Sequence, residues 1–243
     1  MEVFAIVIQK GGTGKTTTAV TLAQAAAFRG KRALLIDLDP QGNATFAAGA
    51  NARGRGSYEL LEGTPAADLI QTIYIGLDVI PASRNLATVT TGRGSARRLQ
   101  QALEPIKGNY DVIIIDTPPT AGELQYNALQ AATGAIFPLQ ADVYNVQSLY
   151  QITDTARQIQ ESNPALHITG FVLTQYDQRS IITRQMRQVI TEKAEAMGVP
   201  FLGTIRAAVA IKEAAALQRS LYDYAPRSNP AEDYLSLFDQ ITE

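Results

Sequence analysis

A glycine-rich stretch near the start of the chain carries lysines and threonines in a pattern suited to binding phosphate. It follows an apolar run and reads Lys10-Gly11-Gly12-Thr13-Gly14-Lys15-Thr16-Thr17. Glycines let backbone N–H groups converge on an anion, and a helix that begins at the end of the loop adds its positive pole. Lys15 can then reach the terminal phosphates of a nucleotide, and the Thr16 hydroxyl can bind Mg²⁺. The strict P-loop pattern requires glycine where Gln9 stands, and this loop has a second lysine, Lys10, beside it.

Three aspartates stand where predicted strands end. Asp37 and Asp39 close an apolar run at residues 32–37, and Asp116 closes the run Asp-Val-Ile-Ile-Ile-Asp at residues 111–116. The carboxyl ends of parallel strands form the edge at which α/β sheets bind ligands. An aspartate at a strand end is by itself more often a turn residue or a helix cap, but downstream of a phosphate loop it can serve the magnesium shell. We therefore expect the three carboxylates near the loop.

Periodicity predicts the elements that must position these residues. Apolar runs indicate strands at residues 2–9, 32–37, 77–81, 111–116, 135–140, 168–174 and 199–205. Helical spacing indicates helices at 16–29, 57–62, 95–106, 123–132, 146–161, 181–197, 211–221 and 230–241, with a loop at 49–56. This alternation predicts an α/β fold: a doubly wound, mostly parallel sheet of about seven to eight strands with helices on both faces. We expect one P-loop domain over residues 1–243, without an N-terminal DNA-binding extension.

Composition narrows the functional classes. The 243 residues are 46% apolar and 18% charged, as in an ordinary globular protein. No apolar run approaches the roughly 18 residues of a membrane span, and Glu2 stands where a secretory signal would be basic. The chain has no cysteine, which excludes a thiolate-held iron–sulfur cluster and so a nitrogenase-reductase-like electron carrier. The net charge of −2 gives no global attraction to nucleic acid, so DNA binding requires a local patch.

The loop and four later blocks resemble one family, the ParA/MinD ATPases with a deviant Walker A loop. The doubled lysine of the loop fits this family. The other blocks, which look like the ParA branch, are Asp-Leu-Asp-Pro-Gln-Gly-Asn-Ala-Thr at 37–45, Tyr-Asp-Val-Ile-Ile-Ile-Asp-Thr-Pro-Pro at 110–119, Pro-Leu-Gln-Ala-Asp at 138–142 and Val-Leu-Thr-Gln-Tyr-Asp at 172–177. The resemblance implies the P-loop NTPase fold and an ATPase switch that uses ATP and Mg²⁺ and is expected in the cytoplasm, associated with the nucleoid.

The resemblance also implies roles for single residues. Lys15 holds the phosphates of its own site, and Lys10 crosses to the partner's phosphates in an ATP-sandwiched homodimer. Asp39 orients or activates the attacking water, Asp37 lies near magnesium and Asp116 holds the metal through water. Members of the ParA branch bind DNA without sequence preference as ATP dimers, and a ParB-like partner on the cargo stimulates their slow hydrolysis. The cargo, a plasmid, chromosome, mobile element or protein assembly, stays open.

The expected DNA surface lies in the C-terminal part of the chain. Residues 177–227 hold eight Lys/Arg against five Asp/Glu, whereas the rest holds thirteen against eighteen. Such side chains give salt-sensitive, sequence-blind phosphate contacts, although a scattered solvated surface explains the counts equally well. The candidates are Arg184, Arg187, Arg206, Lys212 and Arg219. The chain departs from the family here, because two family arginines fall on Ala207 and Ala210, so the DNA and adenine contacts cannot be transferred residue by residue.

Two other functions remain open at this stage. A MinD-like ATPase acting on a membrane or protein cargo needs a C-terminal amphipathic helix rich in Lys/Arg, and residues 235–243 are acidic instead. We therefore expect no membrane partner. A metabolic ATP-dependent enzyme of related fold, such as a ligase acting on a small carboxylate, needs a substrate pocket with its own charged groups. The sequence shows no second constellation of that kind.

Overall fold

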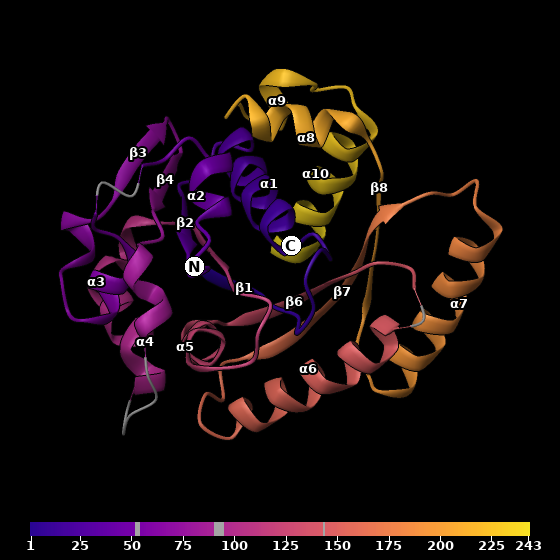
Figure 1. Cartoon of the computed structure of the whole chain (residues 1–243), viewed down its shortest axis with the longest axis horizontal. Coiled ribbons are helices and arrows are strands. Elements are labelled where there is room, and N and C mark those ends of the chain that lie inside the picture. The colour runs from indigo at the N-terminus through magenta and orange to yellow at the C-terminus, as the bar shows by residue number, and fades with distance from the viewer. Residues whose placement is uncertain (52–53, 90–94, 143) are drawn as a thin grey trace.

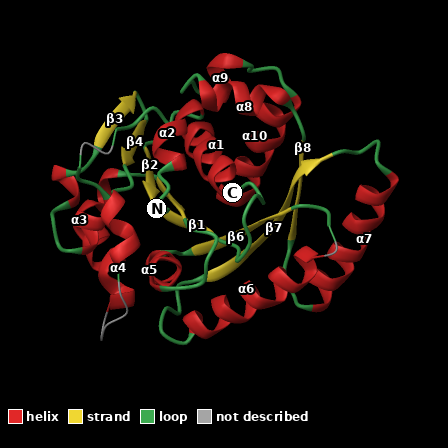
Figure 2. Cartoon of the chain, in the orientation of Figure 1, coloured by secondary structure: helices red, strands yellow, loops and turns green. Residues whose placement is uncertain are grey.

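The computed structural model describes residues 1–51, 54–89, 95–142 and 144–243. Within these residues, eight strands form one sheet in the order β3-β4-β2-β5-β1-β6-β7-β8 (Figures 1 and 2). All neighbouring pairs are parallel except β3 with β4. The predicted fold is therefore confirmed. The strands are β1 (Glu2–Ile6), β2 (Ala33–Asp37), β3 (Gln71–Tyr74), β4 (Leu77–Ile80), β5 (Val112–Asp116), β6 (Gly134–Leu139), β7 (His167–Tyr176) and β8 (Phe201–Arg206).

Helices cover both faces of the sheet (Figure 1). One face carries α1 (Lys15–Phe28), α2 (Asn43–Ala47), α8 (Val209–Ala216), α9 (Leu221–Tyr224) and α10 (Asn229–Thr242). The opposite face carries α3 (Ser57–Leu61), α4 (Arg98–Leu103), α5 (Glu123–Ala131), α6 (Tyr144–Gln160) and α7 (Ile181–Ala196). Among the described residues, no helix is both long and apolar enough to cross a membrane.

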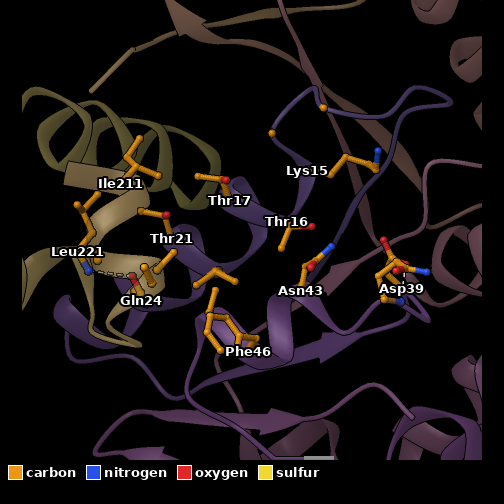
Figure 3. Close-up of a pocket in the computed structure, with 18 of the residues that line it drawn as sticks. Lys15, Thr16, Thr17, Thr21, Gln24, Asp39, Asn43, Phe46, Ile211 and Leu221 are labelled. Atoms are coloured by element: carbon orange, nitrogen blue, oxygen red, sulfur yellow. Dashed lines mark hydrogen bonds between the residues drawn. The ribbon is translucent and has the colours of Figure 1, made fainter. Parts of the chain in front are cut away.

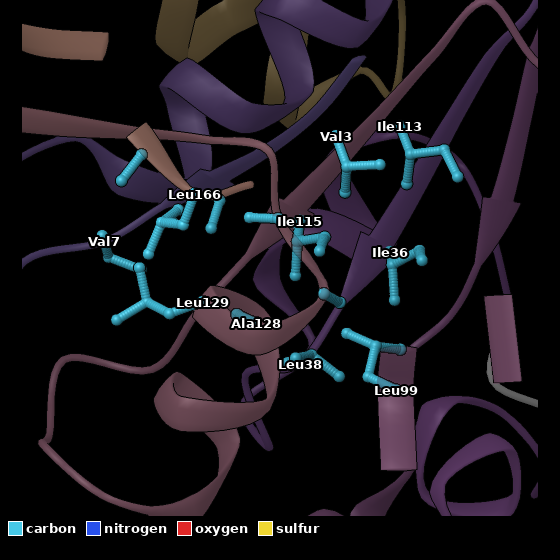
Figure 4. Packing of buried hydrophobic residues seen from close by; sticks show 14 of the residues in the cluster. Val3, Val7, Ile36, Leu38, Leu99, Ile113, Ile115, Ala128, Leu129 and Leu166 are labelled. Carbon is cyan, nitrogen blue, oxygen red and sulfur yellow. The ribbon is translucent and has the colours of Figure 1, made fainter. Parts of the chain in front are cut away.

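Each central strand contributes side chains to two hydrophobic cores. In β5, Ile113 and Ile115 belong to the core on the α4 and α5 side, whereas Val112 and Ile114 belong to the core under α1. Figure 4 shows the first of these cores, where strand side chains converge on Ala128 and Leu129 of α5. Successive side chains of a strand point to opposite faces, so a strand buried on both sides must be apolar throughout. This requirement explains the continuous apolar runs of the sequence.

The structure adds a strand that periodicity missed. Strand β3 pairs with β4 in an antiparallel hairpin closed by Ile75 and Gly76. Gly76 has a φ of 91°, the left-handed conformation that such two-residue turns require. The strand is partly exposed at the edge of the sheet, so it lacks the apolar run that marks the central strands. The X-Gly dipeptide between two short β-rich segments was the available signal.

Two predicted helices are divided. The segment 95–106 contains a 3₁₀ turn (Ser95–Arg97), α4 and the start of a second 3₁₀ segment (Glu104–Asn109), because Pro105 has no N–H to continue the α-helix. The predicted helix at 211–221 is instead α8, a turn and α9. Gln218 adopts a left-handed φ of 53°, and Ser220 caps α9 by accepting a hydrogen bond from the Tyr222 N–H. The predicted loop at 49–56 includes residues 52–53, which lie outside the described residues.

Candidate nucleotide site

The glycine-rich loop joins β1 to α1 at the carboxyl edge of the sheet. Gly12 and Gly14 have left-handed φ values of 76° and 87°, which L-residues with side chains rarely adopt. A Cβ on Gly14 would also lie 3.2 Å from Oγ1 of Thr174, at the end of β7. Helix α1 begins at Lys15, so its positive end faces the loop. The sequence thus folds here into the phosphate cradle that its glycines predict.

Polar side chains at the carboxyl ends of β6 and β7 hold this loop in place. The Thr174 hydroxyl donates to the carbonyl oxygen of Thr13 at 2.6 Å. The amides of Gln140 and Gln175 both donate to the carbonyl oxygen of Gly12, at 2.9 and 3.1 Å. Gln175 does so from a left-handed φ of 51°, a strained conformation for a residue with a side chain. Sequence reasoning missed these tethers, because they join segments about 130 to 160 residues apart.

The two lysines of the loop occupy different environments. Lys15 is only 6% exposed, and its Nζ donates to the carbonyl oxygen of Lys10 at 2.7 Å. Burial lowers the pKa of Lys15, while the charges of Asp116 and Asp39 raise it in part. The Lys10 side chain is directed instead to Asp142, with Nζ 2.9 Å from Oδ2. The loop therefore directs one ammonium inward and the other toward the β6–α6 connection.

Asp116 has the properties expected of a residue that holds a metal. It is completely buried, and neither carboxylate oxygen has a partner at hydrogen-bond geometry. Burial, together with the neighbouring charge of Asp37, raises the pKa of Asp116 well above its ordinary value, although the nearby Thr16 hydroxyl lowers it in part. Burying a charged carboxylate that lacks hydrogen-bond partners costs free energy. Its presence beside a phosphate loop therefore fits a site in which a bound cation neutralises the carboxylate.

Asp37 is equally buried, but its oxygens are already engaged. Oδ1 accepts a hydrogen bond from the Asp39 N–H at 3.0 Å. Oδ2 accepts from both the N–H and the hydroxyl of Thr45, each at 2.7 Å. Burial raises the pKa of Asp37 to about 6, although the bonds from Thr45 lower it in part. Asp37 thereby fixes the start of α2 and the backbone of Asp39. The sequence predicted only that Asp37 lies near magnesium and did not predict this structural role.

Asp39 lines a large cavity that borders the loop. This cavity, the P-loop cavity, has a volume of about 560 Å³ and lies between the loop, α1, α2 and α8. Figure 3 shows Asp39, Lys15 and Thr16 at its phosphate end, with Phe46 and Ile211 farther along. Gln24, Phe46 and Leu221 also line it, and no sequence motif predicted them as site residues.

A smaller cavity, the β8 cavity, adjoins the other side of Thr17. Its volume is about 340 Å³, and it is lined by Gly14, Gln175, Tyr234 and residues of the segment after β8. The two cavities share Gly14 and Thr17, so a nucleotide whose phosphates occupy the loop can place its base beside them.

The donor set fits Mg²⁺ carried by a nucleotide better than a metal held by protein alone. In the described part of the chain, no group of three or more His, Cys, Asp or Glu side chains could hold a metal ion. Mg²⁺ prefers few protein ligands together with substrate phosphates and water. Thr16 at the cavity wall and the unpartnered Asp116 could provide such a site.

The five candidate DNA residues divide between the two faces of the sheet. Arg184 and Arg187 are exposed on α7, and the Arg187 guanidinium lies 5.2 Å from the centre of the Phe201 ring. Lys212 is exposed on α8, and Arg219 lies just beyond it, where it lines the P-loop cavity. Arg206 is engaged elsewhere: its Nη2 lies 2.7 Å from Oδ1 of Asp233 in α10. The structure therefore does not gather all five residues on one face.

The fold and the site together define a P-loop nucleotide-binding protein with a second lysine in its phosphate loop. The family model described as an AAA domain matches residues 1–168. The chain is 37% identical to the sporulation initiation inhibitor protein Soj of Bacillus subtilis, covering 99% of this chain and 98% of that protein. It is 36% identical to the chromosome-partitioning ATPase Soj of Thermus thermophilus, covering 98% and 94%. The chain belongs to the ParA/MinD family of ATPases, in its Soj-like branch.

A solved structure of this fold carries the ligands that the site suits. The Mycobacterium smegmatis protein described as cobyrinic acid a,c-diamide synthase, with ADP and magnesium bound, has a TM-score of 0.79 at 31% identity. The match covers 93% of each chain. The likeness confirms the fold.

Proposed function

We propose that this chain is an ATP-driven switch that positions a DNA cargo. It binds ATP with Mg²⁺, forms a homodimer around the nucleotide, binds DNA without sequence preference in that state and hydrolyses ATP slowly. A ParB-like protein on the cargo stimulates hydrolysis and releases the dimer. The observation that carries the proposal is the buried, unpartnered carboxylate of Asp116 beside a loop with two lysines. The name of the Thermus thermophilus relative, a chromosome-partitioning ATPase, supports the partition role.

Each residue of the site has a task in this proposal. Lys15 leaves the carbonyl of Lys10 and binds the β- and γ-phosphates, and Lys10 reaches the phosphates of the partner subunit. Magnesium, when bound, would neutralise phosphate charge, and Thr16 and Asp116 would hold it, Asp116 through water. Asp39 orients the attacking water from the cavity wall, where the hydrogen bond between its N–H and Asp37 fixes its backbone. Preorganised cations would thus stabilise the negative charge on the reacting phosphate.

The adenine base fits the β8 cavity. The segment 206–209 forms one wall, and Thr17 and Gln175 connect this cavity to the phosphate loop. Alanines at 207 and 208 leave space for a flat ring. Backbone N–H and C=O groups of the segment can form hydrogen bonds with the polar edge of the base. Contacts of this kind do not require the arginines that the ParA branch has at Ala207 and Ala210.

The DNA surface includes the exposed cations Arg184, Arg187 and Lys212. Arg206 contributes less, because it would have to leave Asp233 and Glu232, whose oxygens lie 2.7 and 3.6 Å from Nη2. Arg219 lies close enough to the nucleotide cavity to couple DNA contact to nucleotide state.

Helix α10 lacks the features of a membrane-binding helix of the MinD type. Helix α10 contains Glu232, Asp233 and Asp239 and no Lys or Arg. Its apolar side chains Leu237 and Phe238 are buried in the core. A membrane-binding helix needs an exposed apolar face bordered by cations, and α10 has neither feature.

A salt titration of binding to random-sequence duplex DNA tests the proposal. It is run with ATP, with ADP and without nucleotide. We expect retention only with ATP, with an affinity that falls steeply and linearly on a log–log scale as salt rises. Equal retention in all three conditions, or none at low salt, would overturn the DNA-track function. A metabolic enzyme would instead show ATP turnover that depends on a small carboxylate substrate, so ATPase assays with and without candidate carboxylates complete the test.

A further inference from the structure

The side chain of Lys10 is held by its own chain. Its Nζ lies 2.9 Å from Oδ2 and 3.1 Å from Oδ1 of Asp142, so the ammonium meets both carboxylate oxygens. Asp142 lies just beyond β6, in the connection that leads to α6. Both side chains are only partly buried, with exposed fractions of 29% and 35%. The pair can therefore open without unfolding the core.

Asp142 is itself oriented by Asn145 at the start of α6. The Asn145 N–H donates to Oδ1 of Asp142 at 3.1 Å, and its side-chain amide donates to Oδ2 at 2.8 Å. The same amide donates to the carbonyl oxygen of Gln140 at 2.8 Å. Asn145 is completely buried, so this support is rigid. The carboxylate thus stands in a fixed position that faces Lys10.

We propose that Asp142 is a positioning residue that stores the Lys10 ammonium within its own subunit and so opposes dimerisation until nucleotide phosphates of a second subunit compete for it. This inference rests on the proposed function, in which Lys10 acts across the dimer interface. To act there, the ammonium must leave Asp142, because the ion pair keeps it over the β6–α6 connection of its own chain. The carboxylate then remains hydrogen-bonded to Asn145 and can recapture Lys10 after hydrolysis.

The expected size of the effect follows from the exposure of the pair. Partly exposed ion pairs change an equilibrium by about two- to fivefold. A symmetric dimer uses the same surface on both subunits, so two such pairs open for each dimer formed. Opening both pairs multiplies their effects and predicts a change of about four- to twenty-five-fold in the dimer dissociation constant.

The test measures the dissociation constant of the ATP-bound dimer by analytical ultracentrifugation of the full chain with ATP and Mg²⁺. Asp142→Asn removes the charge but keeps a side chain that can bond Asn145. We expect it to tighten the dimer by the factor given above, with unchanged ATP affinity and melting temperature. Asp142→Glu restores a carboxylate within reach of Lys10 and returns the constant toward the wild-type value. Asp111→Asn, which removes the same charge from the exposed pair with Arg32, is the matched control and leaves it unchanged.

The outcomes separate this inference from the function on which it rests. If the wild-type protein dimerises with ATP but Asp142→Asn leaves the constant unchanged or weakens the dimer, the storage role is wrong and the switch stands. If Asp111→Asn tightens the dimer as much as Asp142→Asn, net charge is the cause and the storage role is again wrong. If the wild-type protein stays monomeric with ATP at every concentration, both the switch and the storage role fail.

Discussion

Lys15 donates a hydrogen bond from Nζ to the backbone carbonyl oxygen of Lys10 across the phosphate loop, at 2.7 Å. Burial lowers the pKa of Lys15 because it disfavours the charged ammonium. Contact with nucleotide phosphates would offset this free-energy cost. The neighbouring side chain of Lys10 points away to Asp142. The loop thus keeps its two ammonium groups apart, which fits one cation acting in its own subunit and the other acting across an interface.

Replacing Lys15 by alanine should abolish ATP binding. The substitution removes the only lysine side chain that lines the P-loop cavity among the described residues. A lost charge-assisted contact to phosphate costs about 1.5–3 kcal/mol for each hydrogen bond. Isothermal titration calorimetry with ATP and Mg²⁺ gives the measurement. Undiminished affinity would refute the assignment of the loop.

Replacing Lys10 by alanine should preserve most of the ATP affinity and remove the ATP-dependent dimer. Lys10 is paired with Asp142 rather than directed at its own phosphate site, so its loss leaves that site largely intact. Light scattering after size-exclusion chromatography reports the mass with ATP and with ADP. Lys15→Ala serves as the contrasting variant, since it should lose both properties. A Lys10→Ala protein that still dimerises with ATP would contradict the trans role.

Replacing Asp39 by alanine should trap the ATP-bound dimer. Loss of a group that orients or activates water lowers the rate of the chemical step by about 10²- to 10⁴-fold. Phosphate release measures the rate, and sedimentation measures the dimer. Asp37→Asn is an informative comparison, because Asp37 orients the Asp39 backbone and the start of α2 from behind. Normal hydrolysis by Asp39→Ala, or a monomer in the presence of ATP, would count against the assignment.

Replacing Asp116 by asparagine should raise the melting temperature of the nucleotide-free protein at pH 8. Burial raises the pKa of Asp116 in the folded state, so folding binds protons there and its contribution to stability falls as pH rises above the ordinary value near 3.8. Asp37, with a pKa raised to about 6, acts in the same direction between about pH 4 and 6. Asparagine removes the buried charge, and each kcal/mol gained raises the melting temperature by about 2–4 °C.

The difference in melting temperature between Asp116→Asn and the wild-type protein should shrink at acidic pH, where Asp116 is protonated. Differential scanning calorimetry at pH 5 and 8 makes this comparison. The same variant should need more Mg²⁺ for ATP hydrolysis. A difference independent of pH, together with an unchanged Mg²⁺ requirement, would exclude both the buried charge and the metal role.

Replacing Arg184 and Arg187 on α7 together by glutamate should weaken retention on random duplex DNA at low salt. Each removed phosphate contact lowers the slope of log affinity against log salt by about 1. ATPase activity without DNA should persist, because neither side chain lines the P-loop cavity or the β8 cavity. Arg32→Glu, at an exposed ion pair with Asp111, is the control for net charge. Retention that falls equally in the control would place the DNA surface elsewhere.

The elements best predicted were those under the strongest local constraint. Strand β5 had to be apolar on both faces, and Gly14 had to adopt a left-handed φ beside Thr174, so each left a clear signal in the sequence. The edge strand β3 and the short helix α2 lacked such signals. Strand β3 is only partly buried, and α2 depends on hydrogen bonds that Thr45 donates to Asp37, eight residues earlier in the chain.

The sequence by itself determined the phosphate loop, the sheet and the family, because backbone conformation and burial restrict residue types locally. Only the tertiary structure decided how the charged groups are used. In the folded chain the carboxylate of Asp116 has no partner at hydrogen-bond geometry, whereas that of Asp37 is hydrogen-bonded. Arg206 forms an ion pair with Asp233, and Lys10 forms one with Asp142, 132 residues away. Such pairings depend on side chains meeting across the folded sheet, and the chemistry of either partner alone does not specify the other.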